Sequence, residues 1–127
     1  MNSRLTPKDR GMVKGAIRRA FSRSELRRSV LQDAKISHTD PSRPRVKTWY
    51  ACAKCSRPFA QHELEVDHIE PIIPVDTALE HMSWDTLVNN TWCDKKKLQV
   101  LCESCHDAKS AIERAQRKEH KKNVKSS

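Results

Sequence analysis

Apolar residues recur at helical spacing in two segments near the start of the chain. Thr6 followed by Pro7 is typical of a helix N-terminus, and Ser24 is suited to cap a second helix from Glu25 to about Lys35. The apolar positions of the first helix fall close to one face and are Met12, Val13, Ile17, Ala20 and Phe21. The opposite face is basic, with Arg10, Lys14, Arg18 and Arg19. We therefore predict two amphipathic helices whose basic faces are exposed.

The middle of the chain changes to strand-like patterns. Trp49 to Pro58 fits a strand that enters a tight turn, and Glu63 to Ile69 alternates polar and apolar residues as a half-buried strand does. A short helix around Asp85 to Asn90 and a short strand from Leu98 to Leu101 follow. From Glu103 to about His120 the spacing is helical again.

These patterns divide the chain into three parts. Residues 1–48 form a basic helical extension that ends in an irregular, Pro-containing linker, and residues 49–120 form a structured module. Residues 121–127 form a basic tail that we expect to be disordered. The predicted fold class is α+β, a small module with basic N-terminal helices and a C-terminal helix.

The composition predicts that hydrophobic burial is not the sole source of stability. Hydrophobic residues make up 36% of the chain and aromatic residues 5%, whereas five residues are Cys. Small folds with little core often rely on disulfides or a structural metal. Because no signal peptide and no run of about 20 apolar residues is present, we expect a cytoplasmic protein with no membrane partner, in which paired Cys bind metal.

The positive charge is unevenly distributed. The formal net charge is +9 for the whole chain, +9 for residues 1–50, −4 for residues 51–105 and +4 for residues 106–127. An acidic middle between two basic arms is what a cation-binding centre with polyanion-binding flanks would have, because basic residues supply phosphate contacts. The alternative is a solvated helix at each end.

Four of the cysteines form two CxxC pairs, Cys52 with Cys55 and Cys102 with Cys105. Two such pairs can complete a closed, tetrahedral, structural Zn²⁺ site. Two unrelated pairs of buried Cys are the alternative. Cys93 is left over and is expected to pack as a small hydrophobic residue.

A second constellation comprises Asp67 and His68 at the end of a strand and His106 directly after the last Cys. An Asp and a His from two elements can hold one divalent ion, and a neighbouring His can deprotonate water. Adjacent strand residues point to opposite faces, but the following Ile69-Glu70-Pro71 suggests that the strand is ending there. The alternative is a surface pair or a core histidine.

The ordered motifs CAKC, VDHIEPIIP and LQVLCESCHDAKS resemble the zinc-containing HNH endonucleases, particularly small phage-encoded ones. The resemblance covers about half the chain, from Tyr50 to Ser110. It implies a treble-clef-like ββα-metal fold with a catalytic divalent ion (Mg²⁺, Mn²⁺, Ni²⁺ or Zn²⁺) beside the structural zinc.

The resemblance also implies roles for three residues. His68 would be the general base that activates water, and Asp67 and His106 would bind the catalytic ion. The implied substrate is DNA, which we expect to be double-stranded, and the products would carry 5′ phosphate and 3′ hydroxyl ends.

The chain departs from the family pattern at Lys97, where an Asn usually stands. That Asn normally braces the loop that carries the general base, and Lys offers donors only. Asn89 or Asn90 could replace its function, or Lys97 could contact a phosphate. The cations that we predict to bind nucleic acid are Lys97, Lys109, Arg18, Arg19, Arg27 and Arg28.

Three functions are compatible with the sequence. The first is a metal-dependent DNA endonuclease or nickase, which includes the homing enzymes. The second is a non-catalytic zinc module that binds nucleic acid or a ribonucleoprotein, and the third is an accessory nuclease of phage DNA packaging that acts with a protein partner. The sequence does not define the oligomeric state.

Overall fold

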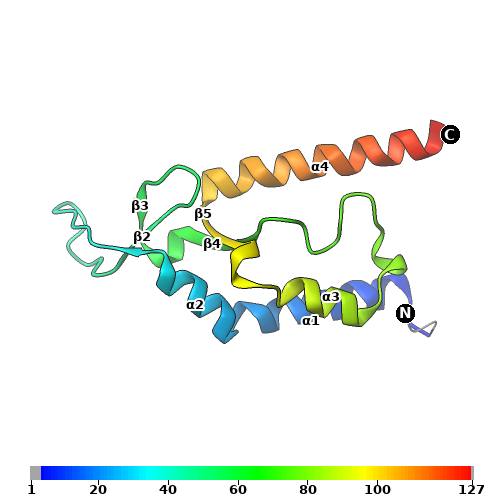
Figure 1. Cartoon of the computed structure of the whole chain (residues 1–127), viewed down its shortest axis with the longest axis horizontal. Helices are drawn as coiled ribbons and strands as arrows, with labels where there is room; N and C mark the ends of the chain where they lie inside the picture. Colours follow the sequence, from blue (N-terminus) through cyan, green and yellow to red (C-terminus); the bar gives the residue numbers. More distant parts are fainter. Residues whose placement is uncertain (1–3, 127) are drawn as a thin grey trace.

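The computed structural model describes residues 4–126 and has an α+β fold. The helices are α1 (Pro7–Ser22), α2 (Glu25–Asp33), α3 (Trp84–Thr91) and α4 (Glu103–Ser126). The strands are β1 (Lys35–Ile36), β2 (Trp49–Ala51), β3 (Pro58–Phe59), β4 (Leu64–His68) and β5 (Leu98–Cys102). Three 3₁₀ turns, Gln61–Glu63, Leu79–His81 and Lys95–Lys97, join them. Helix α4 runs along one side of the molecule, α1 and α3 lie along the other, and the loop after β4 passes between them (Figure 1).

The predicted starts of α1 and α2 are confirmed. The Thr6 hydroxyl accepts a hydrogen bond from the Asp9 N–H, the Asp9 carboxylate accepts one from the Thr6 N–H, and Pro7 occupies the first turn. Ser24 caps α2 through the Arg27 N–H at 3.1 Å. These caps satisfy backbone donors that the first turn leaves without a helical partner.

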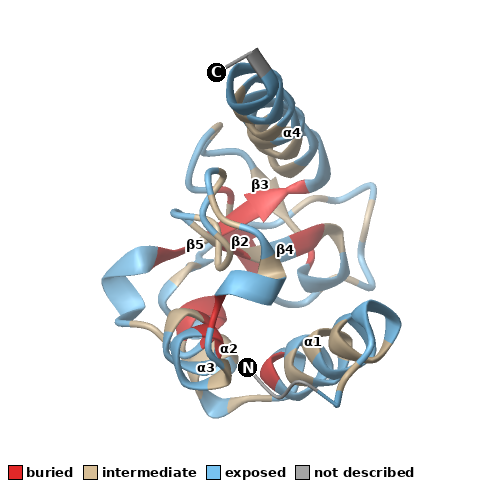
Figure 2. Cartoon of the chain, turned by 90° about the vertical axis from the view of Figure 1, so that its right-hand side faces the viewer, coloured by how far each residue is buried: buried red, intermediate tan, exposed pale blue. Residues whose placement is uncertain are grey.

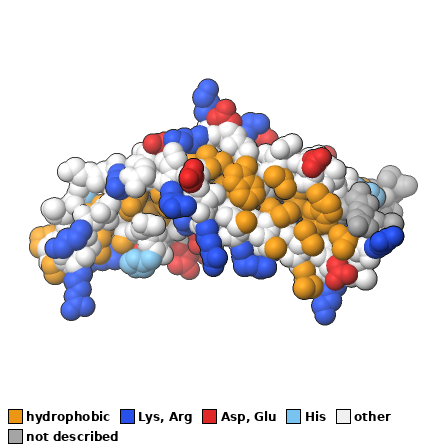
Figure 3. Space-filling model, turned by 90° about the horizontal axis from the view of Figure 1, so that it is seen from below, with side chains coloured by type: hydrophobic (Ala, Val, Ile, Leu, Met, Phe, Trp, Pro, Cys, Tyr) orange, Lys and Arg blue, Asp and Glu red, His pale blue; other side chains and the backbone are white. Residues whose placement is uncertain are grey.

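The prediction that the basic face of α1 is exposed is only partly confirmed, because Arg18 and Arg19 are exposed but Arg10 and Lys14 are partly buried. Of its apolar residues Phe21 is buried, whereas Met12 is 63% exposed. Lys14 and Arg18, on the basic side, line a cleft beside β4. Apolar side chains instead form a band along the outer face of the molecule that carries α1 and α3 (Figure 3).

Two small antiparallel sheets hold the middle of the chain together. Strand β2 lies between β1 and β3, and β4 pairs with β5 along five residues, with Asp67 opposite Gln99 and His68 opposite Leu98. The strand predicted over Glu63 to Ile69 is confirmed, but it does not end before His68, because the Ile69 N–H still donates to the Lys97 carbonyl at 2.9 Å. Asp67 and His68 therefore point to opposite faces of β4.

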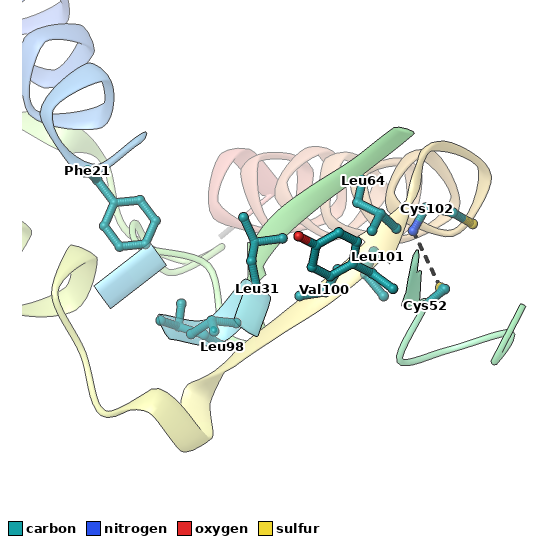
Figure 4. Close-up of a cluster of buried hydrophobic side chains, with 10 residues drawn as sticks. Phe21, Leu31, Cys52, Leu64, Leu98, Val100, Leu101 and Cys102 are labelled. Atoms are coloured by element: carbon teal, nitrogen blue, oxygen red, sulfur yellow. Dashed lines mark hydrogen bonds between the residues drawn. The ribbon is translucent and has the colours of Figure 1, made fainter. Parts of the chain in front are cut away.

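The hydrophobic core joins the N-terminal helices to the paired strands. Val30 and Leu31 of α2 belong to the same buried cluster as Leu64 of β4 and Leu101 of β5. Phe21 and Leu98 lie at one end of this cluster and Cys52 and Cys102 at the other (Figure 4). The core thus connects the N-terminal helices with the cysteine region.

Helix α4 extends beyond its predicted end. It continues to Ser126, whereas the sequence predicts an end near His120 and a disordered tail over 121–127. None of its residues from 103 to 125 is buried, and Figure 2 shows it as an exposed arm above the buried strands. Lys has good helix propensity, which favours continuation of the helix into this exposed segment. Residue 127 lies outside the described residues. No helix in the described chain has the length and apolarity that crossing a membrane requires.

Candidate metal centres and the cleft between them

The structure brings the four paired cysteines into one cluster. Cys52 follows β2, Cys55 lies in the next turn, Cys102 ends β5, and Cys105 lies in the first turn of α4. Their four Sγ atoms all lie within 4.8 Å of one another. The first CxxC turn closes through the Ser56 N–H, which donates to the Cys52 carbonyl at 2.9 Å, and Ser56 takes a φ of 63°.

The spacing of these sulfurs fits a tetrahedral metal ion. With Zn–S bonds of about 2.3 Å, tetrahedral geometry places sulfurs about 3.8 Å apart. Cys55 Sγ and Cys102 Sγ are 3.9 Å apart, far longer than a disulfide bond. The Cys102 N–H points to Cys52 Sγ at 3.4 Å, the kind of backbone contact that orients a thiolate ligand. The cluster could therefore hold a structural metal such as zinc.

The four thiols do not ionise equally easily. Burial disfavours the Cys52 thiolate, but backbone N–H groups of Cys55, Cys102 and Lys54 outweigh burial and lower its pKa to about 6. The contact with Cys102 and then burial raise the pKa of Cys105 to about 12. One thiolate forms readily and another resists ionisation, so four thiolates need a cation between them.

Cys93 is outside this cluster. It packs as a partly buried residue against the hydrophobic core, and burial raises its pKa. The expectation that Cys93 is a small packing residue is confirmed.

Asp67 lies on the face of β4 that looks toward α4. Its side chain is nearly buried, and its Oδ1 lies 3.9 Å from His106 Nε2. The opposite strand residue, Gln99, donates from Nε2 to Asp67 Oδ2 at 3.0 Å. The structure therefore brings Asp67 and His106 together, as predicted, and adds Gln99 as an orienting partner.

Lys109 neutralises this carboxylate. Its Nζ lies 3.3 Å from Asp67 Oδ2, donates to the His68 carbonyl at 3.0 Å, and pairs with Glu113 one turn along α4. Burial opposes protonation of Lys109, but the Glu113 bond and the charge of Asp67 outweigh burial and raise its pKa. Lys109 thus remains a cation beside Asp67.

His68 lies on the other face of the same strand. Its Nε2 is 2.8 Å from the Thr91 carbonyl oxygen at the end of α3, and its ring packs on Phe21 with centroids 5.0 Å apart. A carbonyl only accepts, so Nε2 carries the hydrogen, and in the neutral ring Nδ1 is the basic nitrogen. The hydroxyl of Thr91 donates to the Leu87 carbonyl at 2.7 Å, which fixes the end of α3.

One cleft of about 630 Å³ reaches both faces of β4. Asp67, His68 and His106 line it, and so do three of the predicted nucleic-acid contacts, Arg18, Arg19 and Arg27. Glu65 and Glu113 are the other acidic residues that line it. The cleft therefore contains the three predicted catalytic residues and several cations.

Three predicted nucleic-acid contacts do not line this cleft. Arg28 donates to the carbonyls of Arg23 and Ser24, so it closes the turn between α1 and α2. Lys97 is exposed on the turn before β5, and its backbone carbonyl pairs with Ile69. Lys109 is occupied by Asp67 and Glu113.

Helix α3 contributes an Asn side chain that holds the loop after His68, which is the role expected of an Asn at position 97. Asn90 Nδ2 donates to the Ile72 carbonyl at 3.0 Å, which ties α3 to the loop that follows His68. Asn89 is exposed. Of the two Asn residues that the sequence offers, Asn90 holds that loop.

Sequence analysis missed Gln99, Thr91, Lys14 and Arg117 as residues of this region. The strand register would have identified Gln99, because it lies directly opposite Asp67. Thr91 acts through its backbone carbonyl, for which the sequence has no signal. A comparison with protein-family models, with curated proteins and with solved structures found no match to this chain.

Proposed function

We propose that the chain is a metal-dependent DNA endonuclease or nickase of the HNH type, with β4, β5 and α4 as its ββα-metal unit. The observation that carries the proposal is that Asp67, His106 and His68 all line one cleft, which reaches both faces of β4, and that this cleft lies beside a four-cysteine cluster. The motif order in the sequence supports the same assignment.

The Asp67 and His106 side chains suit a divalent ion. Neighbouring ligands at about 2.1 Å from one ion lie about 3.0–3.4 Å apart, and Asp67 Oδ1 and His106 Nε2 are 3.9 Å apart, so a small side-chain movement would bring both onto one ion. A divalent ion bound there would polarise the scissile phosphate. The second Asp67 oxygen stays oriented by Gln99 and balanced by Lys109.

His68 is proposed as the general base. Its Nε2–H bond to Thr91 leaves Nδ1 to accept a proton from water, and the Phe21 ring limits rotation of the imidazole. The attacking oxygen would then form a bond to phosphorus while the bond to the 3′ oxygen breaks.

A supercoiled-plasmid assay with Mg²⁺, Mn²⁺ or Ni²⁺ tests this function. We expect nicking by the wild type, a loss of about 10²–10⁴-fold in His68→Ala, because a general base contributes that much, and no nicking by Asp67→Asn. His81→Ala is the control, since His81 is exposed and outside the cleft. No nicking by the wild type, or equal nicking by His68→Ala, would sink the proposal.

One observation favours a second candidate, a zinc-stabilised module that binds nucleic acid without cutting it. Lys109 already neutralises Asp67, so the carboxylate has a structural partner without any catalytic ion. This candidate predicts salt-sensitive DNA binding by both the wild type and His68→Ala and no cleavage by either.

A further inference from the structure

Three cations from two helices meet in the cleft without carboxylate partners. Lys14 and Arg18 lie one turn apart on α1, and Arg117 projects from α4. Among the described residues, no Asp or Glu oxygen lies within 4.0 Å of the charged nitrogens of these three side chains. The nearby Glu113 is paired with Lys109.

Arg117 is held in place by neutral groups. Its guanidinium donates to the carbonyls of Ile73 and Pro74 in the loop after β4. Carbonyl oxygens orient the guanidinium but leave its full positive charge uncompensated. Lys14 is half-buried, and burial, followed by repulsion from Arg18 and Arg117, lowers its pKa.

Such an arrangement costs free energy unless an anion occupies it. Like charges that share a cleft repel one another, most strongly at the half-buried Lys14, and a bound phosphate relieves that repulsion for all three residues at once. Arg18 was predicted from the sequence to bind nucleic acid, whereas only the fold shows that Lys14 and Arg117 lie in the same cleft. Their position between α1 and α4 is on the same cleft as Asp67, His68 and His106.

We propose that Lys14, Arg18 and Arg117 form a phosphate clamp that holds a backbone phosphate of a DNA strand in the cleft. The assignment of DNA rests on the proposed function, whereas the clamp itself rests on the three unpaired cations. The clamp would position the strand so that a neighbouring phosphodiester reaches the catalytic residues.

The test measures DNA binding in a background that cannot cut. The full-length His68→Ala protein, loaded with zinc and free of other divalent ions, is titrated against a fluorescent DNA duplex between 50 and 200 mM salt, conditions in which phosphate contacts set the salt slope. Lys14→Gln with Arg117→Gln is compared with Lys8→Gln with Arg114→Gln. The control pair removes the same two charge types from the same two helices at exposed positions outside the cleft.

We expect the clamp pair to bind about tenfold more weakly and to reduce the slope of log affinity against log salt by about one, because the clamp neutralises one phosphate. The control pair should change the slope by less than half of that. Lys14→Arg with Arg117→Lys should restore most of the slope, because each keeps its charge. Equal slopes for clamp and control pairs would overturn the clamp, as would a clamp effect seen with single-stranded RNA but not with DNA.

The clamp and the nuclease can fail separately. If the clamp pair in the His68-containing protein nicks plasmid with an unchanged KM, the clamp is wrong and the nuclease stands. If the wild type never nicks but the clamp pair still loses its salt slope, the clamp stands and the nuclease is wrong. Thermal melting of each variant checks that the loop held by Arg117 remains folded.

Discussion

The two faces of β4 are built in different ways. Asp67 faces α4 and is surrounded by polar groups, namely Gln99, His106 and Lys109. His68 faces the N-terminal helices and is held by one carbonyl and by the Phe21 ring. One face is positioned by charges and by the cysteine cluster at the start of α4, and the other by packing against Phe21 of α1 and by the end of α3.

If the cysteine cluster holds zinc, this difference predicts that loss of the ion has the largest effect. Cys105→Ser should abolish zinc binding and remove cooperative unfolding, because structural zinc contributes about 10–16 kcal/mol and a small domain has only about 5–15 kcal/mol of stability. Circular dichroism with zinc stoichiometry measures it. Cys93→Ser, which leaves the cluster intact, should keep both zinc and the melting transition. A Cys105→Ser protein that melts like the wild type would show that the cluster has no structural role.

Packing on the His68 face has the next largest effect. Phe21→Ala should lower the free energy of unfolding by about 3–5 kcal/mol, because Phe21 is only 7% exposed. Met12→Ala is the control on the same helix and should change it by less than about 0.5 kcal/mol, since Met12 is 63% exposed. Urea unfolding measures both. Equal costs for the two variants would mean that α1 does not pack through Phe21.

The same contrast explains what could be predicted from the sequence. The helix caps at Thr6 and Ser24, the Cys pairs and the proximity of Asp67 to His106 follow from local patterns, because each depends on residues a few positions apart or on one shared metal geometry. The strand that carries Asp67 and His68 was also predictable from its alternation.

The orientation of α1 was not predictable, because a one-sided apolar pattern assumes that the apolar face turns inward. In this fold α1 packs through its C-terminal Phe21, and the cleft takes up Lys14 and Arg18. The contact of His68 with Thr91 was equally invisible, because it uses a backbone carbonyl 23 residues away.

Substitution of Gln99 tests how the Asp67 face of β4 is organised. If Asp67 binds the catalytic ion, Gln99→Ala should weaken Mn²⁺ affinity about tenfold, because partners that orient a metal ligand typically contribute that much. Isothermal titration of the zinc-loaded protein measures it. Gln32→Ala, at an exposed position on α2, should leave Mn²⁺ affinity unchanged. The orienting role of Gln99 would be rejected by equal Mn²⁺ affinities in Gln99→Ala and the wild type.

Asn90 tests the other face and has the smallest expected effect. Its side chain makes one hydrogen bond, to the Ile72 carbonyl in the loop after His68. Loss of this hydrogen bond in Asn90→Ala should destabilise the ordered loop by about 1 kcal/mol. That corresponds to about fivefold slower nicking if the loop must be ordered for cleavage. Amide hydrogen exchange of residues 69–78 should become faster in the same variant. Asn89→Ala is the matched control, because Asn89 is next to Asn90 in the sequence but is exposed, and its loss should change neither quantity. If the two variants behave alike, α3 does not brace this loop.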